Sequence, residues 1–65
     1  MSPQPLSRAD AALTLAILQN HIRWIEGEWC ASDSDEFERS EAPGYVTRRW
    51  LDNLTVAAQI REQLG

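Results

Sequence analysis

The one histidine, His21, is the first side chain in this sequence that could do chemistry. The residues three and four positions away, where a helix places its neighbours, are all apolar or aromatic: Ile17, Leu18, Trp24 and Ile25. No carboxylate stands there to share a metal ion or to orient a general base. We therefore expect His21 at the edge of a core or in solvent. A symmetric dimer that joins two His21 side chains is the one route to a metal site.

The single cysteine and the acidic residues of the middle segment offer no stronger chemistry. Cys30 follows Trp29 at an expected helix end, whose negative pole disfavours a thiolate, so we expect an inert, partly buried cysteine. Residues 31–42 hold five Asp or Glu and one Arg. The stretch from Asp33 to Glu36 lacks the later glycine and the terminal glutamate of a calcium-binding loop, which indicates a solvated acidic connector.

The only adjacent basic residues, Arg48 and Arg49, could contact phosphate or an acidic partner. A helix that reads DNA usually carries more basic and amide side chains, and a chain with a net charge of −4 is a poor general ligand for nucleic acid. A dimeric nucleic-acid-binding regulator that uses this pair is therefore the alternative interpretation. A small helical enzyme or metal protein, built at a dimer interface from His21, Glu28 and Arg61, ranks below it. We predict no catalytic residue, cofactor or metal ligand.

A long amphipathic helix predicted over residues 7–30 must position His21 and Cys30. Ser7 with Asp10 three residues later is typical of a helix start, because the hydroxyl accepts from a free amide and the carboxylate sits at the positive helix end. One apolar stripe recurs at spacings of three and four, the pattern of a helix packed on a neighbour: Leu15, Leu18, Ile22, Ile25 and Trp29.

A second apolar stripe on the same helix consists of Leu13, Ile17 and Trp24. At about 100° per residue, it lies roughly 140° around the helix from the first stripe. A helix that is apolar on two sides needs two surfaces to pack against. Trp24 is the expected anchor of an interface with another molecule, because tryptophan contributes a large apolar area to such contacts.

A second helix is predicted over residues 43–64. Residues at helical spacing form its apolar face, namely Val46, Trp50, Leu54, Ala57, Ile60 and Leu64. Leu51 and Ala58 widen this face, so it is broader than one neighbouring helix requires. Two polar residues intrude on it, Asn53 and Arg61. They either fix the register and the partner of the helix or lie at its rim.

The remaining segments join these helices into a single domain. Residues 1–6 contain two prolines and predict an extended arm. In the acidic connector, residues 31–42, we expect a short helical turn over residues 35–39, with Phe37 as an anchor on the helices. The sequence thus predicts an all-α antiparallel helical hairpin that dimerises into a four-helix bundle. A parallel arrangement ranks below it, because the connector would have to stretch along the whole helix.

The surplus apolar surface predicts the class of function. A 65-residue chain makes one small domain that is marginal as a monomer, so we expect a homodimer and an unidentified protein partner. The expected function is a non-catalytic protein–protein interaction module, a small regulator or adaptor that acts through an apolar helical face and the acidic loop. The candidate interface residues are Leu13, Ile17, Trp24, Trp50, Leu51 and Asn53.

Shape and composition also suggest where such a module is used. The predicted hairpin resembles, in shape and without a matching motif, the small helical hairpins of plasmid and phage regulators and of some antitoxins. All six basic residues are arginine, which favours a bacterial or phage origin. No apolar run reaches the ~18 residues of a membrane span, the first five residues lack the pattern of a signal peptide, and a single cysteine fits a reducing compartment. These features predict a soluble, cytoplasmic protein.

Overall fold

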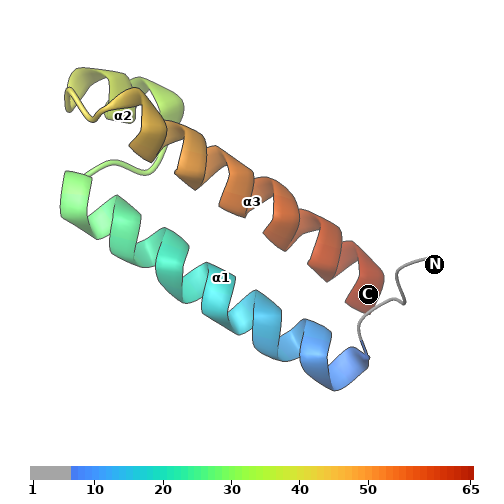
Figure 1. The fold of residues 1–65 in the computed structure, drawn as a ribbon. Helices are drawn as coiled ribbons and strands as arrows, with labels where there is room; N and C mark the ends of the chain where they lie inside the picture. The colour runs from blue at the N-terminus through green and yellow to red at the C-terminus, as the bar shows by residue number, and fades with distance from the viewer. Residues whose placement is uncertain (1–6) are drawn as a thin grey trace.

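Three helices make up the part of the chain that the computed structural model describes, residues 7–65. They are α1 (Arg8–Trp29), α2 (Ser34–Arg39) and α3 (Gly44–Leu64), and no strand occurs in that range. The two long helices α1 and α3 lie side by side in opposite directions (Figure 1). This confirms the predicted all-α antiparallel hairpin. The predicted arm, residues 1–6, lies outside the described residues.

Both ends of α1 are capped by local hydrogen bonds. At the start, the Ser7 hydroxyl accepts from the backbone N–H of Asp10 at 3.1 Å, as the Ser7–Asp10 spacing predicts. At the end, Cys30 adopts a left-handed conformation with φ of 51°, and its N–H donates to the carbonyl of Glu26. The expectation of a partly buried cysteine is wrong. This turn takes Cys30 out of the helix before the chain becomes buried at Ala31, so the thiol is exposed.

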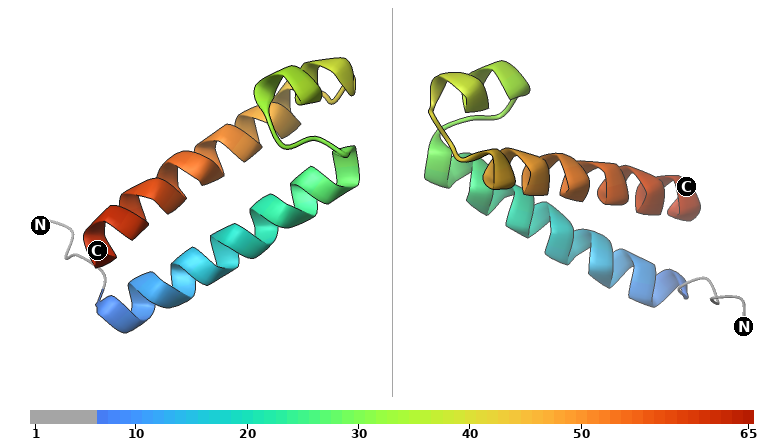
Figure 2. Two further views of the ribbon diagram at one scale, coloured as in Figure 1. Left: turned by 180° about the vertical axis from the view of Figure 1, so that it is seen from behind. Right: turned by 45° about the horizontal axis from the view of Figure 1, so that its top comes forward.

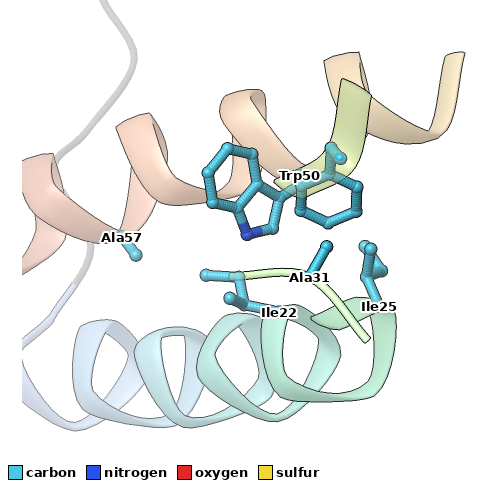
Figure 3. Close-up of a cluster of buried hydrophobic side chains, with 6 residues drawn as sticks. Ile22, Ile25, Ala31, Trp50 and Ala57 are labelled. Carbon is cyan, nitrogen blue, oxygen red and sulfur yellow. The ribbon is translucent and has the colours of Figure 1, made fainter. Parts of the chain in front are cut away.

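The core lies between α1 and α3 at the end of the hairpin where the connector crosses. Ile22 and Ile25 of α1 meet Trp50 and Ala57 of α3, and Ala31 follows directly after the turn (Figure 3). The four helical residues belong to the stripe and the face that the periodicity predicts to pack. Ala31 does not, because it lies in the connector that the sequence predicts to be solvated, yet it is only 3% exposed. Partly buried apolar side chains extend the core along both helices, namely Leu15, Leu18, Trp29, Ala42, Val46 and Leu54.

The acidic connector folds into α2, a helix one residue longer at its start than the predicted turn. Asp33 caps it, since its side chain accepts from the backbone N–H of Glu36 at 2.8 Å, and the Ser32 hydroxyl donates to the Glu36 carboxylate at 2.9 Å. Phe37 is fully buried, with its ring centre 4.8 Å from that of Trp50 and a tilt of 45° between the rings. α2 thereby covers the closed end of the hairpin (Figure 2).

Phe37→Ala is expected to lower the free energy of unfolding by about 3–5 kcal/mol, because it leaves a cavity beside Trp50. Urea unfolding followed by circular dichroism measures this loss. The total stability of so small a domain is itself only about 3–5 kcal/mol, so the variant should lose helical signal even without urea. The control is Tyr45→Ala, which truncates an exposed ring and should cost no more than about 0.5 kcal/mol. An unchanged unfolding midpoint for Phe37→Ala contradicts the prediction.

The Asp33 cap predicts a dependence of stability on pH. The backbone N–H of Glu36, which donates to the Asp33 carboxylate, holds the pKa of that group below its ordinary value of 3.8. The folded state therefore favours the charged carboxylate more than the unfolded chain does. The resulting stability is present above pH 3.8 and is lost as the pH falls through the lowered pKa.

Unfolding midpoints of the wild type and Asp33→Asn, measured between neutral pH and pH 3, test this cap. Asparagine also caps helices but does not titrate, so the variant should lose part of the acid-induced destabilisation while keeping α2. Asp33→Ala should be less stable than both at neutral pH. If the unfolding midpoints of the wild type and Asp33→Asn fall equally between neutral pH and pH 3, the cap is not a source of the pH dependence.

Candidate interaction surface

Leu13, Ile17 and Trp24 form an uncovered apolar stripe along one side of α1. Their exposed fractions are 61%, 61% and 63%. The first stripe of the same helix, with Ile22 and Ile25, is buried against α3. α3 and the connector thus cover one apolar side of α1, and within the described residues nothing covers the other. We call Leu13, Ile17 and Trp24 the α1 stripe.

A shallow groove between the two long helices borders the α1 stripe at Trp24. Its first hollow, of about 320 Å³, has walls from both helices, which include His21, Trp24, Glu28, Tyr45 and Arg49. A second hollow, of about 520 Å³, continues along α3 and shares His21, Tyr45 and Arg49 with the first. The stripe and the groove therefore form one continuous surface, which we call the α1–α3 face.

Two aromatic rings of α1 are held together where the α1 stripe meets the groove. The rings of His21 and Trp24 are nearly parallel, at 8°, with centres 6.2 Å apart. This separation is within the range of interacting aromatic pairs. His21 is half-buried, which agrees with the first of its two predicted places, the edge of the core or solvent. The stack restricts the rotation of Trp24, so the largest exposed apolar side chain of the stripe is partly ordered within the single chain.

The polar residues of α3 on this face are mostly engaged within their own helix. The Arg48 Nε donates to Asp52 at 3.1 Å, in an exposed ion pair one turn apart. The side-chain amide of Asn53 donates to the backbone carbonyl of Arg49 at 2.9 Å. Asn53, a candidate interface residue, is half-buried in the second hollow. The predicted basic pair is thus divided: Arg48 is held by a carboxylate, and Arg49 lines both hollows.

Trp50 is placed differently from the other candidate interface residues. It is only 4% exposed, so its ring belongs to the core of its own chain and offers almost no surface to a partner. Its indole N–H donates to the Glu26 carboxylate of α1 at 2.9 Å. This contact was not predicted from the sequence. Its only signal was the position of Glu26, next to Ile25 and one turn after Ile22.

The trio His21, Glu28 and Arg61 is not brought together within one chain. His21 and Glu28 line the groove, whereas Arg61 lines another hollow beside Arg23 and Glu26. Over residues 7–65, no group of three or more His, Cys, Asp or Glu side chains is placed to hold a metal ion. Leu51, also a candidate interface residue, is 41% exposed and lines a further hollow beside α2.

Comparison with protein-family models, curated proteins and solved structures found no match for this chain. Among the described helices, none has both the length and the apolar character that crossing a membrane requires. The function is therefore inferred from the surface itself.

Glu26→Ala is expected to lower the free energy of unfolding by about 1–3 kcal/mol, because it leaves the buried indole N–H of Trp50 without its acceptor. The matched control is Glu26→Gln, which keeps an oxygen acceptor and should lose less than about 1 kcal/mol. Urea unfolding of both variants measures the difference. Equal losses for the two would mean that the hydrogen bond contributes nothing beyond the packing of the side chain.

Proposed function

We propose that this chain is a non-catalytic protein–protein interaction module, a small regulator or adaptor that docks through the α1 stripe. The observation that carries the proposal is the exposure of Leu13, Ile17 and Trp24 in one line, while the packing side of α1 is already filled. Exposed apolar residues that are scattered singly are ordinary, whereas an aligned set with a tryptophan is typical of an interface.

The proposal includes the pairing of two hairpins into a four-helix bundle. A chain of this length buries only about 60% of its unfolded surface, so a second copy adds core that one hairpin lacks. Leu51 supports α3 as the shared surface. It lies about 200° around that helix from Arg49, on the side away from the groove, so a dimer formed there leaves the α1 stripe open. A mass of 7.4 kDa at high concentration in light scattering contradicts this pairing.

Two further parts of the proposal concern the cellular compartment and the alternative function. The lone cysteine, Cys30, supports a reducing, cytoplasmic setting for the module. The alternative is a dimeric nucleic-acid-binding regulator that uses Arg48 and Arg49. It has less support, because Asp52 already neutralises Arg48 and the chain as a whole carries a net charge of −4.

Trp24→Glu is expected to abolish the capture of partner proteins from the native host and to leave helicity unchanged, because Trp24 is exposed and lies outside the core. Affinity capture with tagged wild type and variant, followed by mass spectrometry, measures the loss, and circular dichroism checks the fold. The matched control is Gln59→Glu, which adds the same charge at an exposed position of α3 and should retain the partners. Equal capture by Trp24→Glu and wild type removes the α1 stripe from the function.

A further inference from the structure

Two acidic residues stand at the ends of the α1 stripe. Asp10 precedes Leu13 by three positions and Glu28 follows Trp24 by four, and both are exposed. At about 100° per residue, both lie within about 40° of the line through the stripe. At 1.5 Å per residue, the 18 positions between them span about 27 Å. The stripe is therefore an apolar line with a negative charge at each end.

The arginines nearest in sequence and in space lie off this line. Arg8 and Arg23 are about 160° and 100° around α1 from the centre of the stripe. Arg49 belongs to α3 and lines the wall of the groove opposite α1. Since none of the three lies between Asp10 and Glu28 on the stripe side, the charge that a partner meets along the apolar line is negative.

These charges disfavour a second copy of the chain as the occupant of the α1 stripe. An antiparallel pairing that sets Leu13 against Trp24 of the second copy brings Asp10 within one residue of Glu28 of that copy, because both pairs share nearly the same midpoint. A parallel pairing sets each acidic residue against its own duplicate. Either arrangement places like charges together at both ends, which an interface between copies avoids. The phosphates of nucleic acid and of anionic lipid meet the same repulsion.

We propose that the occupant of the α1 stripe is an amphipathic helix of another protein that carries Lys or Arg at both ends of its apolar face. This inference rests on the docking function proposed above and adds the chemistry of the partner. The matching helix has apolar residues at spacings of three and four to cover Ile17 and Trp24, with basic residues about 18 positions apart. The groove beside Trp24 receives the larger of its apolar side chains, against Tyr45.

Two synthetic peptides test the charge selection. Both are amphipathic Leu/Ala helices of about 24 residues; one has Lys at both ends of the apolar face, about 18 positions apart, and the other has Glu there. Fluorescence anisotropy of each labelled peptide, titrated with the full chain at low salt, gives the Kd. The Lys peptide should bind at least about tenfold more tightly than the Glu peptide. Trp24→Ala should raise the Kd of the Lys peptide more than about tenfold.

A matched pair of double variants separates the stripe from the general acidity of the chain. Asp10→Asn with Glu28→Gln should raise the Kd of the Lys peptide about fivefold, the effect of two exposed ion pairs. Glu38→Gln with Glu62→Gln changes the net charge by the same amount on α2 and α3, and should stay within about twofold of the wild type. Equal effects of the two double variants overturn the proposal.

The other outcomes distinguish failure of this inference from failure of docking itself. Equal binding of both peptides, lost in Trp24→Ala, overturns the charge selection and leaves docking standing. Self-association of the wild type that Trp24→Ala abolishes in light scattering assigns the stripe to a second copy and overturns the proposal. Absence of binding by the Lys peptide also overturns it, and the docking function fails as well if Trp24→Glu captures the same host proteins as the wild type.

Discussion

The rest of this structure depends on the contacts of the buried Trp50 side chain. Its ring lies in one buried cluster with Ile22, Ile25 and Phe37, and its N–H donates to Glu26. One side chain of α3 thus joins all three helices, and its single polar atom is satisfied where it becomes buried. The hydrogen bond requires Glu26 to turn toward α3, on the side of α1 where Ile22 and Ile25 are buried. Together these contacts fix the rotation of α1 about its own axis.

That rotation decides which side of α1 is left for other molecules. With Ile22 and Glu26 directed at α3, the geometry of a helix carries Ile17 and Trp24 to the outside. A third long helix could have covered them. The connector instead forms the short helix α2, which covers the end of the hairpin and not its side. The exposed stripe is therefore a direct consequence of how the core closes, and the interaction function proposed for it has the same origin.

The charged side chains lie on the surface and outside the core. Among residues 7–65, no charged side chain is buried. The carboxylates of the connector lie around α2, and the carboxylate of Asp33 caps that helix. On the α1–α3 face, Asp52 offsets Arg48, so the acidic ends of the α1 stripe are not balanced by that arginine. The proposed apolar contact and the proposed electrostatic selection of a partner thus use the same surface, and neither requires a buried charge in the fold.

The sequence by itself determined the helices, the cap at Ser7 and the two apolar stripes of α1, because spacing along one helix fixes which residues share a side. It also indicated Phe37 as an anchor, because Phe37 is the one large apolar residue in an otherwise polar connector. Only the tertiary structure decided that Trp50 belongs wholly to the core, that Glu26 faces inward and that Cys30 is exposed. The helical period gives the direction of each side chain around the helix axis. Whether that side chain is buried or exposed depends on contacts with residues distant in the chain.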